Sequence, residues 1–181
     1  MTRWNFDGDN SAPFLYSFPL NPMNFIRKMT TNVAKYRYNH TMYRIRDPKA
    51  SLKFYTEILG MKLVDEHHSD EAKFSLYFLG YEDPASEGLV RLARQGLLEL
   101  THNHGTENDA SFAYNTGNGD QGGYGHIAIT VDDLTAACAR FDEFGVKFVK
   151  RPEEGRMRHI AFIADPDGYR VEILENPMLQ A

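Results

Sequence analysis

The sequence contains a single cysteine, Cys138, which cannot form an internal disulfide, so we expect packing alone to stabilise the protein in a reducing, cytoplasmic compartment. Cys138 lies among alanines in a helical pattern, and we interpret it as a small buried apolar residue. No stretch approaches the roughly 18 continuous apolar residues of a membrane span, and the N-terminus lacks a basic-then-apolar secretory pattern. The formal net charge of −5 gives no broad positive field, so we expect neither a nucleic acid nor a membrane as partner.

The chain is long and apolar enough to bury a sizeable core, with 181 residues of which 42% are hydrophobic. Residues 1–37 carry several prolines and scattered aromatic residues without a steady period. We therefore expect residues 1–37 to form an arm that is flexible or packs on a partner subunit, and residues 38–181 to form the folded domain.

The first half of this domain predicts a strand, a helix and three further strands. The strand begins at His40, and Asp47 and Pro48 then open a helix that Gly60 ends. Further strands are expected at residues 61–64, 74–79 and 97–101.

The second half repeats this course. A strand is expected at 126–131, an acidic cap at Asp132 and Asp133, a helix that Gly145 ends, and strands at 146–149, 158–163 and 169–174. The Asp-Pro-Asp-Gly run at 165–168 is typical of a hairpin turn. The sequence thus predicts an α+β fold of two βαβββ modules, at 38–103 and 124–176, with a loop between them. We expect their curved mixed sheets to close around a shared metal cleft.

Two histidines and two glutamates fall on matching positions of this repeat. His40 matches His126 at the start of the first strand, and Glu99 matches Glu172 on the last strand. Each interrupts apolar neighbours, and alternation directs it to the inward face, where an unpaired charge is costly. Any one of them alone would more often be a hydrogen-bonded or solvated residue. Their recurrence favours one divalent metal held by all four, and nitrogen and oxygen donors without thiolates suit Zn²⁺, Ni²⁺, Co²⁺ or Mn²⁺.

The remaining histidines lack this support. His67 and His68 are expected in a polar, solvent-facing turn. His102, His104 and His159 are expected close enough to the cleft to contact a substrate, but the repeat does not support ligation by them.

Several motifs, in order along residues 38–176, resemble the glyoxalase I (lactoylglutathione lyase) family of the vicinal oxygen chelate superfamily. They are HTMYRIRDP (40–48), SLKFYTEILGM (51–61), KFSLYFL (73–79), LELTHN (98–103), GYGHI (123–127) and DPDGY (165–169). The resemblance implies isomerisation of the methylglyoxal–glutathione hemithioacetal to S-lactoylglutathione through an enediolate, which detoxifies methylglyoxal. It also implies a homodimer with metal sites at the interface, and ligands from both chains. Zn²⁺ is the preferred metal, with Ni²⁺ or Co²⁺ as alternatives, because relatives differ in whether the residue matching His40 is histidine or glutamine.

The resemblance also suggests roles for individual side chains. Glu172 is expected to move the substrate proton as the catalytic base, with Glu99 as its counterpart on the opposite face. Glutathione contacts are expected from Arg44 and Asn103 at the γ-glutamyl end and from Lys150 at the glycyl end, with Met157 lining the pocket. From the residues alone, Arg44 and Lys150 would be ordinary surface charges.

One position departs from the family pattern. Gly122 stands where close relatives carry an arginine that holds glutathione, which puts the affinity for glutathione or the choice of thiol in question. A substitute contact could come from Arg151, Arg156 or Arg158.

Two other functions are open to a chain of this pattern. A ring-opening dioxygenase of the same superfamily would use iron held by two histidines and one carboxylate, whereas both halves here offer a carboxylate. A non-catalytic protein that sequesters a drug could dispense with the ligands altogether.

Overall fold

The computed structural model describes residues 31–82 and 84–179. The chain divides into two units after Tyr36, and both predicted modules lie in the second unit, Arg37–Ala181. Most of the expected arm, residues 1–37, lies outside the described residues. Its described part contains one short 3-10 helix, η1 (Val33–Lys35).

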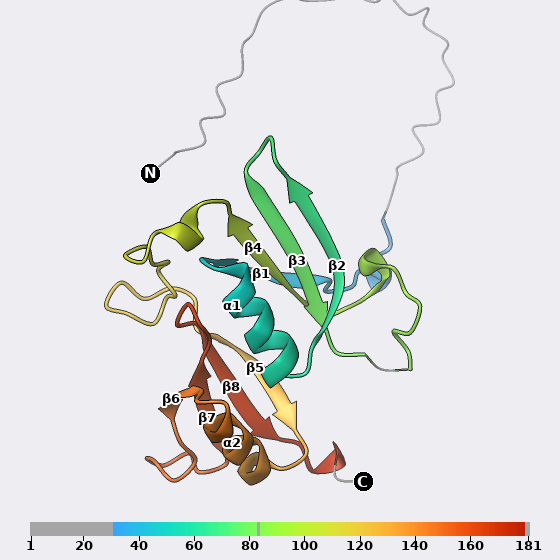
Figure 1. The fold of residues 1–181 in the computed structure, drawn as a ribbon. Helices are drawn as coiled ribbons and strands as arrows, with labels where there is room; N and C mark the ends of the chain where they lie inside the picture. The colour runs from blue at the N-terminus through green and yellow to red at the C-terminus, as the bar shows by residue number, and fades with distance from the viewer. Residues whose placement is uncertain (1–30, 83, 180–181) are drawn as a thin grey trace, which may run out of the picture. The chain divides into compact units, whose positions relative to one another are not determined.

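The first module is a four-stranded mixed sheet with one helical segment (Figure 1). Its elements are β1 (His40–Ile45), α1 (Pro48–Lys53) continued by the π-helical turn η2 (Phe54–Ile58), β2 (Lys62–Ser69), β3 (Phe74–Gly80), the 3-10 helix η3 (Arg91–Ala93) and β4 (Leu97–Asn103). The strand order is β1-β4-β3-β2, and only β1 and β4 run parallel.

The second module has the same topology. It contains β5 (His126–Val131), α2 (Leu134–Glu143), β6 (Lys147–Lys150), β7 (Ile160–Ala164) and β8 (Arg170–Glu175), in the order β5-β8-β7-β6. The 3-10 helices η4 (Thr106–Asn108) and η5 (Pro177–Leu179) lie outside the two sheets. The predicted α+β class with paired βαβββ modules is therefore confirmed.

Helix capping accounts for the matching start and end of the two helical segments. The side chain of Asp47 accepts a hydrogen bond from the backbone N–H of Lys49, and that of Asp133 accepts one from Ala136. Gly60 and Gly145 follow the helical segments with φ of +76° and +66°, a conformation that side chains disfavour. These four signals were readable in the sequence, and they lie where they were predicted.

The strand β2 is longer than the sequence indicated. It continues to Ser69, so His67 and His68 lie in the strand and not in a turn, which corrects the expectation. Pairing of β2 with β3 outweighed the polar composition of this segment, as cross-strand contacts commonly do. Both histidines are nevertheless exposed, as expected.

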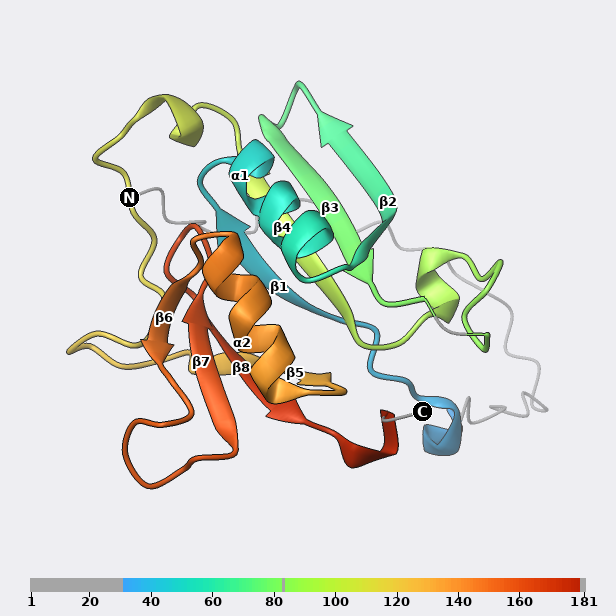
Figure 2. The ribbon, with the colours of Figure 1, turned by 60° about the horizontal axis from the view of Figure 1, so that its bottom comes forward.

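Both helices cover one side of the sheets, and the other side of each sheet is open (Figures 1 and 2). Alternate strand residues pack under the helices in one hydrophobic core, which includes Ile45, Tyr55, Leu100, Cys138 and Ile173. Cys138 is buried, as expected. The residues between these positions along each strand, among them His40 and Glu99, therefore lie on the open side.

The 165–168 turn joins the two modules. Asp165 accepts backbone hydrogen bonds from Asp167 and Tyr169, which confirms the predicted turn, and the hydroxyl of Tyr55 donates to its Oδ2 atom at 2.9 Å. Burial raises the pKa of Asp165 to about 6. The ring of Tyr169 stacks on that of Tyr43 with centroids 4.6 Å apart.

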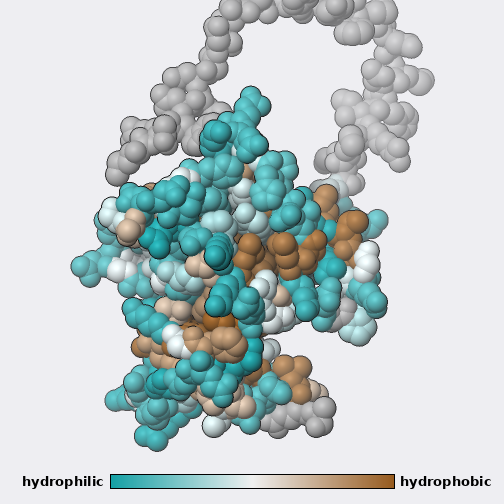
Figure 3. Space-filling view, viewed as in Figure 1, coloured by the Kyte–Doolittle hydropathy of each residue, from teal (hydrophilic) through white to brown (hydrophobic). Residues whose placement is uncertain are grey.

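Figure 3 shows that the surface in this view is mainly hydrophilic, with apolar side chains gathered in smaller areas. Among residues 31–82 and 84–179, no helix combines the length and apolar character that crossing a membrane requires.

Candidate metal centre

The first candidate pair lies on the open side of the first sheet. The Nε2 atom of His40 is 2.8 Å from the Oε2 atom of Glu99. The two residues lie on the adjacent parallel strands β1 and β4, and the register that places Met42 beside Glu99 brings His40 within reach.

The second module repeats this pair. His126 and Glu172 lie on β5 and β8 at the equivalent register, with Nε2 and Oε2 3.2 Å apart. The predicted correspondence of the two histidines and two glutamates therefore holds in space as well as in sequence.

A phenylalanine lies against each imidazole, and the sequence reasoning missed both. The ring of Phe78 meets His40 edge-on with centroids 5.7 Å apart, and Phe162 meets His126 in the same way at 5.1 Å. Phe78 pairs with Glu99 and Phe162 with Glu172 in the strand registers. The repeat contained this signal, because both phenylalanines occupy the same position of the third strand in their module.

The four candidate ligands are more open to solvent than expected. The glutamate side chains are 12% and 18% exposed, but the imidazoles are 36% and 41% exposed. The alternation of side chains along the strands does place the histidine and the glutamate of each pair on one face of their sheet, as predicted. That face is the open one, and nothing within residues 31–82 and 84–179 closes it over the histidines.

The chain does not bring the two pairs together. Within the described part of the chain, no three histidine, cysteine, aspartate or glutamate side chains are grouped closely enough to hold a metal ion. The expectation that the halves close around a shared cleft is thus not met within a single chain, because both pairs lie on open sheet faces. Each chain instead presents two half-sites of one imidazole and one carboxylate.

Each half-site has the chemistry of a divalent metal site. In both modules Nε2 of the histidine lies at hydrogen-bond distance from the carboxylate, to which it donates when no metal is bound. A metal that replaced this hydrogen would find a nitrogen and an oxygen lone pair side by side. The Oε1 atom of Glu99 has only a long contact, 3.4 Å from the hydroxyl of Thr101. A carboxylate with so few donors around it is suited to a cation, and the nitrogen and oxygen set matches Zn²⁺, Ni²⁺ or Co²⁺.

Arg44 and Asn103 lie further along the same open face. Each is four residues beyond a member of the first pair on the same strand, which places it about 13 Å away along the strand. Arg44 lines a cavity of about 230 Å³ with Tyr114 and Asn115. Asn103 donates to the Tyr114 hydroxyl at 3.3 Å, so these side chains form a polar end to the face.

Lys150 and Met157 lie together in the second module. The Nζ atom of Lys150 donates to the backbone carbonyls of Arg151, Met157 and Ile160, which closes the loop between β6 and β7. Met157 is half exposed at the surface of this loop. The ammonium group thus orders the segment that presents Met157.

The position that departs from the family pattern has no side chain. Gly122 has a φ of +64°, and a Cβ atom there would meet no other atom within 4 Å. Space therefore does not exclude a larger residue, but the backbone conformation favours glycine.

Arg151, one of the residues considered as a substitute contact, is held by Asp142, which raises the pKa of Arg151 and lowers that of Asp142. Its guanidinium also lies 3.8 Å over the Phe148 ring, so Arg151 has partners of its own.

His102 does not face the candidate centre, which corrects the expectation. It lies three residues after Glu99 on β4, and alternation therefore buries it on the helix side, where Nε2 bonds Glu107 at 2.7 Å. His104 and His68 both contact the hydroxyl of Ser75, which is buried on the helix side. Their partners place these histidines away from the open face.

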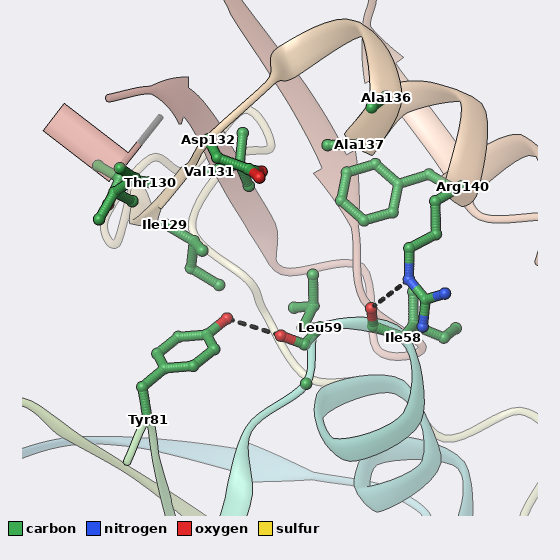
Figure 4. A pocket seen from close by; sticks show the side chains of 13 residues that line it. Ile58, Leu59, Tyr81, Ile129, Thr130, Val131, Asp132, Ala136, Ala137 and Arg140 are labelled. Atoms are coloured by element: carbon green, nitrogen blue, oxygen red, sulfur yellow. Dashed lines mark hydrogen bonds between the residues drawn. The ribbon is translucent and has the colours of Figure 1, made fainter. Parts of the chain in front are cut away.

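A larger cavity, of about 600 Å³, lies away from both pairs. It is bordered by the end of the first helical segment, by β5 and by α2 (Figure 4). The polar groups at its rim bond backbone carbonyls, with Tyr81 donating to Leu59 and Arg140 to Ile58. Its lining contains no histidine, so it is not part of the candidate centre.

Duplicate βαβββ modules, each with an open sheet face, are the fold of the vicinal oxygen chelate class of proteins. A family model described as the glyoxalase/bleomycin resistance protein/dioxygenase superfamily matches residues 37–173. The chain belongs to this superfamily.

Several similar proteins within it are named lactoylglutathione lyase or glyoxalase I. A lactoylglutathione lyase of Pseudomonas putida is 50% identical over 167 residues, which cover 86% of this chain and 96% of the relative. A lactoylglutathione lyase of Schizosaccharomyces pombe is 44% identical over 168 residues, and the match spans 88% of this chain but only 54% of that relative. Among solved structures, the trypanothione-dependent glyoxalase I of Leishmania major has a TM-score of 0.62 at 35% identity, covering 80% of this chain and 89% of that one.

Proposed function

We propose that the protein is a lactoylglutathione lyase, which isomerises the hemithioacetal of methylglyoxal and glutathione to S-lactoylglutathione. The repeated His–Glu pair on the open faces of both modules carries this proposal. Relatives that bear this activity in their names match nearly the whole chain at 44–50% identity. The single cysteine supports a reducing, cytoplasmic compartment as part of the proposal.

We propose that the metal centre forms between two copies of the chain. His40 and Glu99 of one copy would meet the His126–Glu172 pair of the other, since each pair is partly exposed and has no third candidate ligand among residues 31–82 and 84–179. A homodimer with two-fold symmetry would form two such centres. Zn²⁺ is the preferred metal, with Ni²⁺ and Co²⁺ as alternatives.

The reaction removes a proton from the carbon beside a carbonyl and returns it to the neighbouring carbon. The bound metal would act as a Lewis acid that stabilises the negative charge of the enediolate. Glu172 would take the proton and return it, and a positioned base of this kind contributes about 10²- to 10⁴-fold to the rate. Glu99 would stand on the opposite face of the substrate, and the rings of Phe78 and Phe162 would keep water from the histidines.

Glutathione would extend along the open face from the metal. Arg44 lies about 13 Å along β1 from His40 and Asn103 about 13 Å along β4 from Glu99, and a guanidinium there can hold the γ-glutamyl carboxylate. The loop that Lys150 orders would meet the glycyl end, with Met157 against the ligand. Gly122 offers no arginine, so Arg44 would carry more of the carboxylate recognition here.

Metal-free enzyme given methylglyoxal and glutathione tests the proposal directly. Separate additions of Zn²⁺, Ni²⁺, Co²⁺ and Mn²⁺ should restore thioester formation, measured by ultraviolet absorbance. A second arm with trypanothione, the thiol named for the Leishmania major relative, measures the thiol choice. No thioester with any metal and either thiol would refute the proposed reaction, and oxygen uptake with catechols would then identify a dioxygenase.

A further inference from the structure

The side chain of Asn39, directly before the candidate ligand His40, has a fixed orientation. Its Nδ2 atom lies 3.0 Å from the carbonyl oxygen of Arg91 and 2.9 Å from that of Arg94. Carbonyl oxygens only accept hydrogen bonds, so both contacts require the amide nitrogen. The amide oxygen Oδ1 is therefore the atom that faces His40.

This orientation places a hydrogen on Nδ1 of His40. The Nδ1 atom lies 2.8 Å from Oδ1 of Asn39, and because Oδ1 can only accept, Nδ1 carries a hydrogen. The other ring nitrogen, Nε2, is directed at Oε2 of Glu99 at 2.8 Å, a contact that requires a hydrogen on Nε2 when no metal is bound. A metal at the first half-site would replace that hydrogen and take the Nε2 lone pair, while Nδ1 keeps its hydrogen. We propose that Asn39 is a positioning residue, which holds His40 in the tautomer and ring orientation that a metal at the first half-site requires. The inference rests on the proposed metal centre.

The two carbonyls that anchor Asn39 are themselves held to the sheet. They belong to η3 and its C-terminal cap, in the segment between β3 and β4. The guanidinium of Arg91 bonds Asp65 at 2.8 Å and lies 4.2 Å over the ring of Phe78, the residue that also contacts His40. The backbone N–H of Leu97 donates to the carbonyl of Asn39 at 2.8 Å. The η3 segment, the amide of Asn39 and the imidazole of His40 are thus connected by direct contacts.

Among the described residues, the second module has no side chain that holds His126 as Asn39 holds His40. Gly125 precedes His126 and has no side chain, and the link between β7 and β8 is the short 165–169 turn. Among the described residues, no group bonds Nδ1 of His126. The first half-site is therefore the ordered one, and it would bind the metal with less loss of side-chain freedom.

Two Asn39 variants separate positioning from general stability. Asn39→Ala removes both the acceptor and the anchor, whereas Asn39→Asp keeps an acceptor for Nδ1. We expect Asn39→Ala to weaken Zn²⁺ and Co²⁺ affinity by about 10- to 100-fold, measured by chelator competition, and to change the visible spectrum of the Co²⁺ form. Asn39→Asp loses both contacts to the carbonyls of Arg91 and Arg94 but keeps the acceptor, so its affinity should lie between those of Asn39→Ala and wild type. Asn108→Ala, which removes an exposed amide bonded to Glu107, is the matched control and should bind as wild type.

A measurement of the hydrogen bond between Asn39 and His40 does not depend on the metal. Long-range proton–nitrogen NMR of the metal-free enzyme should show a hydrogen on Nδ1 of His40 that exchanges slowly with solvent, and Asn39→Ala should make this exchange faster. An unchanged exchange of the Nδ1 hydrogen or an unchanged metal affinity in Asn39→Ala, with strong loss in His40→Ala, would overturn the role of Asn39 alone. Wild-type protein that binds no metal would overturn the metal centre, whatever the NMR result.

Discussion

Subunit complementation distinguishes a metal centre within one chain from a centre shared by two copies. His40→Ala removes a ligand of the first pair, and Glu172→Gln removes one of the second, so each variant alone should be inactive. In a mixed dimer with shared centres, one centre receives both substitutions and the other receives none. Purified mixed dimers should therefore show about half of wild-type activity, and a random equimolar mixture about a quarter.

The assay uses two affinity tags to purify mixed dimers, followed by thioester absorbance. Its matched control combines His40→Ala with Glu99→Gln, which lie in the same half-site. In a mixed dimer of these two variants each centre lacks one ligand, so the dimer should stay inactive. Mixed dimers of the first pair that recover no activity, despite correct size and tags, would refute the shared centre. Recovery in the control would show that His40 and Glu99 do not serve one centre.

The remaining predictions concern the base, the module junction and the glutathione end. Glu172→Gln should lower turnover about 10²-fold or more because an amide cannot accept the proton, with dimer size by light scattering unchanged; full activity would place the base elsewhere. Tyr55→Phe should cost about 1–3 kcal/mol in urea unfolding, because it removes a donor from the buried Asp165 carboxyl; an unchanged midpoint would contradict this. The pKa of Asp165 is raised from 3.8 to about 6, so the folded state binds the extra proton and stability should fall as pH rises from 4 to 6, by at most about 3 kcal/mol. Unfolding curves at several pH values should show that Asp165→Asn does not lose this stability between pH 4 and 6. An equal pH dependence of stability in wild type and Asp165→Asn would refute the role of Asp165. Arg44→Gln should raise KM for the glutathione hemithioacetal about 10- to 100-fold with little change in kcat, and a fall in kcat alone would argue against a binding role.

The fold was largely predictable because its signals are local and occur twice. Asp47 with Gly60, and Asp133 with Gly145, mark the ends of equivalent helical segments, and their agreement made each more informative. The error in β2 arose where cross-strand pairing decided the outcome. The polar residues around His67 favoured a turn, but pairing with β3 extended the strand through them.

The two histidine–glutamate pairs of the proposed metal centre were predictable for the same reason, whereas the way in which the two pairs would meet was not. Strand alternation determines which residues share a face, so it grouped His40 with Glu99 and His126 with Glu172. Alternation does not determine which faces meet, because that depends on packing between modules or between subunits. The repeat suggested closure within one chain, but contacts of the Asp165 turn and of the tyrosines around it hold the modules side by side, and no residue of 31–82 or 84–179 covers the two histidines.

The difference between the two half-sites follows from a segment that only one module has. A repeat comparison finds what the halves share, so it identified the ligands and contained the signal for Phe78 and Phe162. Asn39 has no counterpart beside His126, and its partners Arg91 and Arg94 lie more than 50 residues further along the chain. Its role depends on contacts between residues far apart in the sequence, so the repeat pattern of the sequence could not reveal it. If the centre is shared between subunits, each metal would meet one ordered and one less ordered histidine, and the ordered half-site would be the natural first point of binding.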